Sequence, residues 1–186
     1  KFVYRSEEGG AYSPLDKFAG NEYEDYTVKS GKLYRYIIRA YAGGYSDSNA
    51  ADMTIKYKGA RLAEVGNLAE SVRIIKSTSD WHIEIQQKKS NEAELVSYEG
   101  RTYKVKESGI HKESTISTSF YLPNKEAESL ERIHGLNGIY LFRNSETCIC
   151  CEITDFSFKN DLFDRGKTFD LSLIRINYDL GVRFGD

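Results

Sequence analysis

The sequence contains little methionine and little proline, with one Met and two Pro in 186 residues. By contrast it holds 14 Tyr and nine Phe, and aromatic side chains suit the pleated, half-buried surface of a strand. The composition therefore favours a mainly β protein. Hydrophobic residues make up 40% of the sequence. The length of 186 residues suits one large domain or two small ones, each able to bury a core.

Long apolar runs and an excess of one charge are also missing. The stretch from Leu33 to Tyr41 is interrupted by Arg35 and Arg39, and it is far shorter than the roughly 20 residues that a membrane helix needs. Lys and Arg number 26 and Asp and Glu 28, so no global field draws the protein to nucleic acid or to an anionic membrane. The first residue is Lys1 and a strand pattern is already under way there, so we expect a fragment of a longer chain.

Cysteine is scarce as well, with three residues in one short stretch at Cys148, Cys150 and Cys151. An odd number without a distant partner argues against a disulfide scaffold. A structural zinc site needs four ligands in paired spacing, and no second cysteine pair exists. The three histidines lie in separate predicted elements, at His82, His111 and His134. We therefore predict that the cysteines pack in a β core, and we predict no metal and no cofactor.

Signatures of catalysis are absent from the local sequence. No Ser, His and Asp arrangement has a recognisable local pattern, and no phosphate-binding glycine loop precedes a helix. Glu152 and Asp155 lie on one predicted strand with opposite parity, which predicts that they face opposite sides and form no carboxylate pair. The basic stretch from Gln86 to Lys89 has no interleaved aromatic residues, which favours a solvated loop over a nucleic-acid site. We predict no catalytic residues and a protein that is not an enzyme.

Strand-favouring side chains between turn signals predict four strands in the first third of the chain, with a glycine turn over Glu7 to Gly10 and a loop over Gly43 to Asn49. These strands are Lys1 to Arg5, Tyr23 to Val28, Leu33 to Tyr41 and Met53 to Tyr57.

These residues resemble a fibronectin type III module. The similar features are Asp25 to Val28, the Ser30-Gly31 pair, Tyr34 to Ala40, and a Gly-Tyr-Ser turn before the last strand. The resemblance implies a sandwich in residues 1–58 and a tyrosine corner at Tyr34, whose hydroxyl bonds back to the chain just upstream. The first two strands of that family and their core Trp have no counterpart here, and we expect them upstream of Lys1.

A second domain is predicted to begin after Lys58-Gly59 and to cover residues 59–186. Its strands are predicted at Val72 to Lys76, Trp81 to Gln86, Leu95 to Tyr98, Arg101 to Val105, Thr115 to Leu122 and Ile139 to Phe142.

Turn and cap signals punctuate this second part. Glu99-Gly100 predicts a tight hairpin turn, Gln87 to Glu94 a polar loop, and Ser108-Gly109 a break in the chain. One helix is predicted to start after Pro123, with Asn124 as its cap and Gly135 as its end. Its apolar stripe consists of Ala127, Leu130 and Ile133.

Two strands close the predicted fold, Cys148 to Phe158 and Phe169 to Tyr178, followed by a tail from Gly181 to Asp186. In each strand the apolar residues change parity part of the way along, at Thr154 and at Leu173. Because side chains alternate faces with period two, such a slip implies a bulge or a strand that passes between layers. We predict that the two strands pair antiparallel, with irregular pairing near Thr154 or Leu173. The fold class predicted is mainly β, a partial fibronectin-like sandwich followed by a β-sandwich or split barrel with one short α-helix.

From about Gly59 the order of features is similar to minor structural proteins of bacteriophage tails and baseplates. The stretches that carry the resemblance are Tyr98 to Arg101, Ser114 to Thr118, Gly138 to Arg143, Glu152 to Phe158 and Leu171 to Tyr178.

The resemblance implies a viral structural protein that takes part in virion assembly. It would bind other tail or baseplate proteins and self-associate through exposed strand edges. It would belong to the virion and be assembled in the host cytoplasm. The alternative is a carbohydrate-binding adhesin, or an accessory module of a cell-wall hydrolase, in which Tyr12, Tyr41 and Tyr45 stack on sugar rings of a cell-surface glycan.

Overall fold

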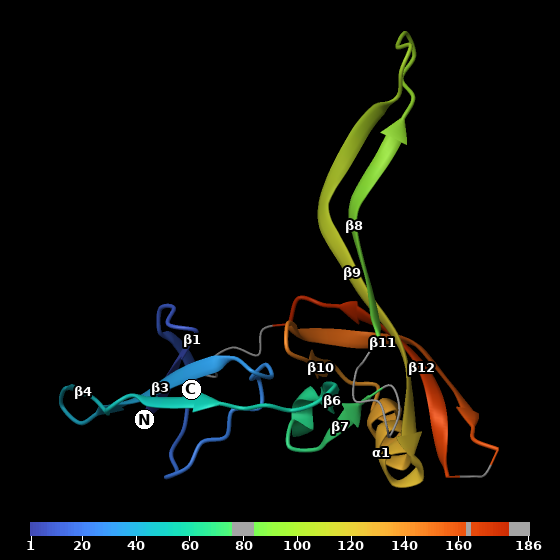
Figure 1. Cartoon of the computed structure of the whole chain (residues 1–186). Coiled ribbons are helices and arrows are strands. Elements are labelled where there is room, and N and C mark those ends of the chain that lie inside the picture. Colours follow the sequence, from blue (N-terminus) through green and yellow to red (C-terminus); the bar gives the residue numbers. More distant parts are fainter. Residues whose placement is uncertain (76–83, 163–164, 179–186) are drawn as a thin grey trace.

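The computed structural model describes residues 1–75, 84–162 and 165–178, and the predicted mainly β fold is confirmed. Two antiparallel sheets and one α-helix make up the described chain (Figure 1). In the first sheet the strand order is β2-β1-β3-β4, and β5 also pairs with β3. Its strands are β1 Phe2–Glu7, β2 Ser13–Lys17, β3 Leu33–Tyr41, β4 Tyr45–Asp47 and β5 Ala51–Thr54.

The second sheet has seven strands in the order β7-β6-β10-β11-β12-β9-β8. A 3₁₀ turn, Val65–Asn67, follows β6, and α1 (Asn124–Gly135) follows β9. The strands are β6 Ala60–Glu64, β7 Ser71–Ile74, β8 Ile85–Val96, β9 Val105–Pro123, β10 Tyr140–Arg143, β11 Cys148–Asn160 and β12 Gly166–Arg175. The chain passes from the first sheet to the second between Thr54 and Ala60.

The tyrosine-corner contact predicted for Tyr34 is confirmed. Its side chain is 1% exposed, and its hydroxyl oxygen accepts a hydrogen bond from the Lys29 amide at 2.9 Å. The strand predicted over Tyr23 to Val28 is wrong, because that segment is irregular apart from a turn at Tyr26 and Thr27. Asp25 Oδ1 accepts a hydrogen bond from the Thr27 amide at 2.8 Å, and this side-chain contact replaces a strand ladder with a local turn.

Strands in the first sheet differ from the predicted ones in four further places. β1 runs to Glu7, two residues past the predicted end at Arg5. β2 was not predicted, and the short strand β4 lies inside the predicted loop. β5 begins two residues earlier than expected and ends at Thr54, so the segment up to Tyr57 leaves the sheet and reaches toward the second one.

The core of the second sheet forms where β9 and α1 meet. The predicted inward face of β9 is confirmed, since Ile116, Thr118, Phe120 and Leu122 are all at most 7% exposed. α1 covers this face, and its predicted apolar stripe is buried. The predicted cap is wrong, because Pro123 occupies the N-cap position and Asn124 is the first helical residue. The core cluster also includes residues from five other strands, Leu62, Val72, Phe142, Cys151 and Phe169.

β11 and β12 pair antiparallel as predicted, and β10 is a buried central strand between β6 and β11. The register shifts between Ile153 and Asp155, which places the predicted irregularity at Thr154. β12 ends at Arg175, three residues before the predicted end, and it carries no bulge at Leu173. The parity change in β12 is not a bulge: Leu171 and Leu173 are buried, and the next residue, Ile174, lies partly buried on the opposite face.

The bulge in β11 changes the faces on which Glu152 and Asp155 lie. Glu152 lies opposite Ile174 and Asp155 opposite Ser172, so the extra residue brings both carboxylates to the same, outer face. Both are exposed. The prediction that they face opposite sides is wrong because the parity count does not hold across a bulge.

Candidate functional site: the arm and the inter-sheet cavity

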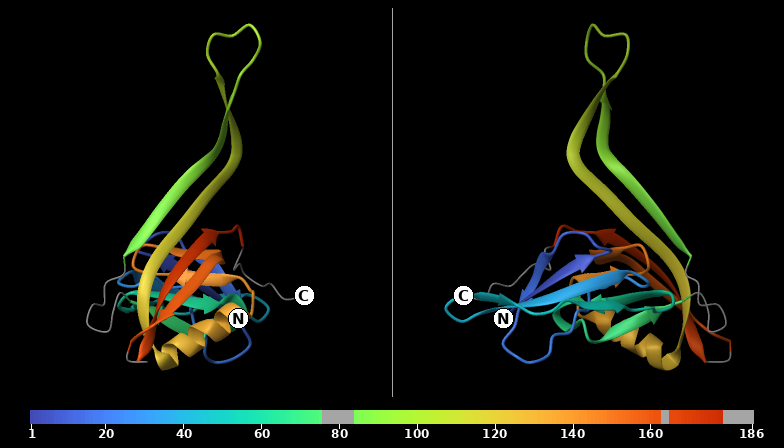
Figure 2. Two further views of the ribbon diagram at one scale, coloured as in Figure 1. Left: turned by 90° about the vertical axis from the view of Figure 1, so that its right-hand side faces the viewer. Right: turned by 60° about the vertical axis from the view of Figure 1, so that its left-hand side comes forward.

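A two-stranded ribbon stands out from both sheets (Figure 2). β12 pairs with β9 from Thr115 to Pro123, whereas β8 pairs with β9 along its length, from Ile85 opposite Thr118 to Val96 opposite Val105. The β9 segment before Thr115 therefore has β8 as its only described neighbour. We call β8, the β9 residues 105–114 and the turn between them the arm. Ten residues of strand extend about 33 Å at 3.3 Å per residue.

Sequence reasoning found the turn of the arm but missed its length. The Arg101 amide donates a hydrogen bond to the Tyr98 carbonyl at 3.2 Å, and Gly100 has φ 84°, so a turn does form at Glu99-Gly100. The predicted two-residue connection between strands Leu95 to Tyr98 and Arg101 to Val105 is wrong, because β8 ends at Val96 and β9 begins at Val105. The predicted loop from Gln87 to Glu94 is wrong, since it forms most of β8. Alternating hydrophobicity reveals a strand only when one of its faces is buried. Residues 86–89 of β8 are exposed on both faces, so they carry no such pattern.

The predicted break at Ser108-Gly109 is also wrong, because β9 runs through it. The register does shift there: Asn91 lies opposite Lys112, whereas Ala93 lies opposite Ser108. Half of the strand predicted over Trp81 to Gln86 lies outside the described residues, and its last two residues begin β8. The tail from Gly181 to Asp186 lies wholly outside them.

Large hydrophobic side chains are exposed to water at the far end of the arm, beside the charged residues Glu99, Arg101 and Lys104. Leu95 is 61% exposed, Tyr98 46% and Tyr103 84%. The near end is held to the sheet, because Thr118 Oγ1 donates a hydrogen bond to the Glu84 carbonyl at 2.8 Å. The arm is thus fixed at its base and presents large hydrophobic side chains at its tip.

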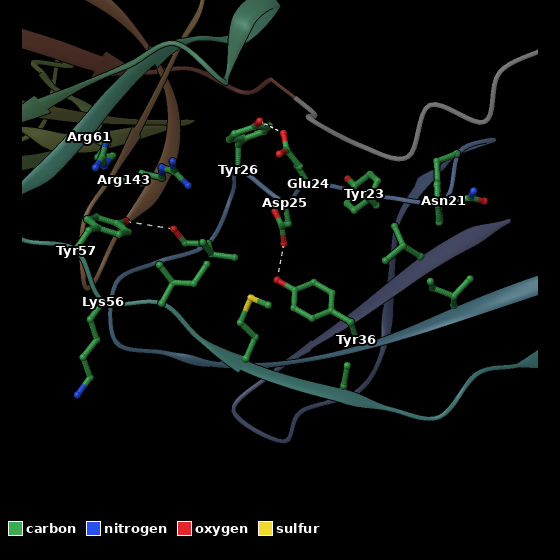
Figure 3. Close-up of a pocket in the computed structure, with 17 residues that line it drawn as sticks. Asn21, Tyr23, Glu24, Asp25, Tyr26, Tyr36, Lys56, Tyr57, Arg61 and Arg143 are labelled. Atoms are coloured by element: carbon green, nitrogen blue, oxygen red, sulfur yellow. Dashed lines mark hydrogen bonds between the residues drawn. The ribbon is translucent and has the colours of Figure 1, made fainter.

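A second feature is a cavity of about 670 Å³ between the two sheets (Figure 3). Strand residues of the first sheet form its apolar side, including Val3, Ile38 and Met53. Arg61 of β6 and Arg143 of β10 line it from the second sheet. We call it the inter-sheet cavity.

Asp25 is the most densely bonded side chain of this cavity. Its carboxylate accepts hydrogen bonds from Arg5 Nη1 at 2.8 Å, from the Tyr36 hydroxyl at 2.8 Å and from Thr27 Oγ1 at 2.7 Å. Burial by itself would raise the pKa of this carboxyl, but the Arg5 charge and the Thr27 hydrogen bonds outweigh it and lower the pKa. Asp25 is therefore ionised and ties β1, β3 and the intervening loop together.

Tyr57 joins the two sheets at the other side of the cavity. Its hydroxyl lies 3.2 Å from the Val28 carbonyl and 3.2 Å from the Asn144 carbonyl. Ser30 donates its amide to the same Asn144 carbonyl at 3.2 Å. Burial raises the pKa of Tyr57 to about 12, so the hydroxyl keeps its proton as a donor at neutral pH.

The three cysteines are partly or fully shielded from solvent, and the described histidine side chain, His134, packs on an aromatic ring. Cys151 is fully buried and Cys150 is 7% exposed. Burial raises the pKa of Cys148 to about 11 and that of Cys151 to about 12, so both stay as thiols at neutral pH. His134 stacks on Phe156 at 4.1 Å.

His82 and the His111 side chain fall outside the described residues. In the described part of the chain, no group of three or more His, Cys, Asp or Glu could hold a metal ion. There too, no helix has the length and apolar character to cross a membrane.

Two of the three tyrosines considered for sugar stacking come together. Tyr41 and Tyr45 pair across β3 and β4, with ring centroids 5.2 Å apart, and they are 65% and 72% exposed. Tyr12 is 40% exposed and has no ring contact with this pair in the described structure.

The chain has structural likeness to solved proteins but no match in sequence. No family model matches the chain, and no curated protein matches it in sequence. A solved chain from the tail of an empty gene transfer agent particle, refined with C6 symmetry, is similar in structure with a TM-score of 0.44 and 9% identity, over 65% of this chain and 92% of that chain. A chain from the virion of a native gene transfer agent particle has a TM-score of 0.42 and 8% identity, over 59% of this chain and 87% of that chain. At these TM-scores neither likeness establishes a shared fold.

Proposed function

We propose that this chain is a non-enzymatic structural subunit of a phage tail or baseplate, and that it assembles through the arm. The arm is the observation that carries the proposal. A two-stranded hairpin without a further layer is marginally stable in water, and its outer strand edges offer unpaired backbone groups to another chain. A neighbouring subunit would provide the missing layer by pairing with the edge and covering the apolar tip.

The rest of the proposal follows from the sequence resemblances. Residues 1–58 would form the fibronectin type III-like module, which spaces or decorates the assembly, and the Tyr34 hydrogen bond supports this identification. Residues 59–186 would form the tail-type domain that docks into a ring of like subunits. Its partners would be other tail or baseplate proteins and further copies of this chain. The protein would be found in the virion after assembly in the host cytoplasm.

Removing the apolar tip should weaken assembly. We expect Leu95→Ser with Tyr103→Ser to reduce self-association, or binding to purified tail partners, by at least about tenfold, because two exposed apolar anchors are lost. Sedimentation velocity over a range of concentrations measures the effect, and negative-stain images show the particles.

The matched control is Leu136→Ser with Tyr45→Ser, which removes the same residue types at 60% and 72% exposure away from the arm. It should assemble like the unmodified protein. A strict monomer that never joins tail partners, or an arm variant that assembles normally, would contradict the proposal.

A carbohydrate-binding module is the alternative function, supported by the exposed ring pair of Tyr41 and Tyr45. If it holds, Tyr45→Ala should abolish binding on a glycan array, because one face of the stacking platform is removed. The same variant should leave self-association unchanged. An array without any bound glycan would remove this alternative.

A further inference from the structure

The inter-sheet cavity joins two kinds of surface in one space. Its floor is apolar: Val3 is buried, whereas Met53 and Ile55 are 53% and 39% exposed. At one end stand the guanidinium groups of Arg61 and Arg143, with the ring of Tyr57 between the two sheets (Figure 3). Their guanidinium carbons lie 5.9 Å and 5.6 Å from the centre of that ring.

The two arginines belong to a row of like charges across three strands. Arg143 lies directly opposite Arg61, and Arg61 lies directly opposite Arg73. Like charges in directly opposed positions destabilise a sheet. Burial, the charge of Arg143 and that of Arg73 together lower the pKa of Arg61. Arg73 pairs with Glu126, whose Oε1 lies 3.5 Å from Arg73 Nη2, so the cost of the row falls on Arg61 and Arg143.

No carboxylate of the described residues forms an ion pair with Arg61 or Arg143. Arg61 donates to the Ser71 hydroxyl at 3.1 Å, and Arg143 is 8% exposed. The two carboxylates that line the cavity are engaged elsewhere. Glu24 accepts a hydrogen bond from the Tyr26 hydroxyl, and Asp25 is bonded to Arg5, Thr27 and Tyr36.

We propose that the inter-sheet cavity binds an extended polypeptide segment that brings a carboxylate to Arg61 and Arg143 and lays apolar side chains on the floor. A guanidinium pair matches a carboxylate through charge-assisted hydrogen bonds. A small anion would satisfy the arginines but leave the floor in water. An extended segment does both, because its side chains alternate between two faces. The site does not depend on the assembly role of the arm.

Two synthetic peptides test this site on the whole chain. Both have blocked ends and alternate valine with threonine over nine residues, and they differ in one central residue, glutamate or glutamine. Fluorescence anisotropy of the labelled peptides gives their affinities. We expect the glutamate peptide to bind at least about tenfold more tightly, because its charge meets a desolvated cationic site.

Charge-matched variants show where the preference originates. Arg61→Gln should remove the preference for glutamate. Arg35→Gln should keep the preference for glutamate. Tyr36 lines the cavity, so its neighbour Arg35 faces the opposite side of β3, where it pairs with Asp52. Arg143→Gln provides a second loss at the site, with circular dichroism to verify that it folds.

Three results would overturn the proposal: equal or absent binding of the two peptides, a preference that survives Arg61→Gln, or displacement of the labelled peptide by sodium acetate as effective as by the unlabelled glutamate peptide. The last result would identify a small-anion site in its place.

Discussion

Replacing Gly59 with alanine should lower the free energy of unfolding by about 3 kcal/mol or more. Gly59 has φ +73°, and a Cβ there would lie 2.2 Å from the Ile74 carbonyl oxygen and 2.7 Å from Ile75 Cγ2. The left-handed conformation alone costs an L residue about 1–2 kcal/mol. The clash adds to this, because the contacted atom is backbone that forms the Ala60 to Ile74 pairing of β6 and β7.

Gly9→Ala separates the two contributions. Gly9 has φ +80° with nothing within 4 Å of the added Cβ, so only the conformational cost of about 1 kcal/mol should appear. Urea unfolding followed by circular dichroism measures both variants, and the slope with denaturant should stay the same. Equal losses in the two variants would show that the approach of residue 59 to β7 is not tight.

Gly59 also illustrates why some features follow from sequence alone. The change in pattern after Tyr57 and the Lys58-Gly59 pair predict a domain boundary, which stays a prediction. The chain passes from the first sheet to the second between Thr54 and Ala60. Likewise, alternation in β9 and the parity change at Thr154 depend only on neighbouring residues, so local periodicity predicts them.

Features that depend on distant partners could not be predicted in this way. Tyr23 to Val28 is rich in residue types that favour strands, but the bonds of Asp25 to Arg5 and Tyr36 need tertiary contact before they favour an irregular loop. The arm is a strand pair with solvent on both sides, and periodicity gives no signal for it.

The inter-sheet cavity could not be found from sequence for the same reason. Arg61 and Arg143 are far apart in the sequence, with 81 residues between them. The pairing of β6 with β10 brings them together. The only local signal was an arginine ending the otherwise apolar stretch of Tyr140 to Arg143. Whether such a residue faces a partner or a cavity is decided by the register of a strand far away in sequence.

Asp25→Asn should lower the free energy of unfolding at neutral pH by about 3 kcal/mol, because it leaves the charge of Arg5 without its buried partner. The two side chains are 20% and 8% exposed, so solvent screens the pair little. Asp52→Asn is the matched control. Asp52 and its partner Arg35 are 46% and 48% exposed, and the loss of that surface pair should have no measurable effect.

Acid should remove the advantage of the unmodified protein over Asp25→Asn. In the folded chain the pKa of Asp25 is lowered from the ordinary aspartate value of about 3.9. As the pH falls, the Asp25 carboxylate is therefore protonated in the unfolded chain before it is protonated in the folded one. The contribution of the Asp25 charge is therefore fully present above about pH 5, and it is lost as the pH falls through the lowered pKa. Urea unfolding at a series of pH values should give a constant difference between the two proteins from about pH 8 to 5, and a shrinking one below that. A difference that stays constant into acid would mean that the Asp25 charge does not stabilise the turn, and that asparagine destabilises it by shape alone.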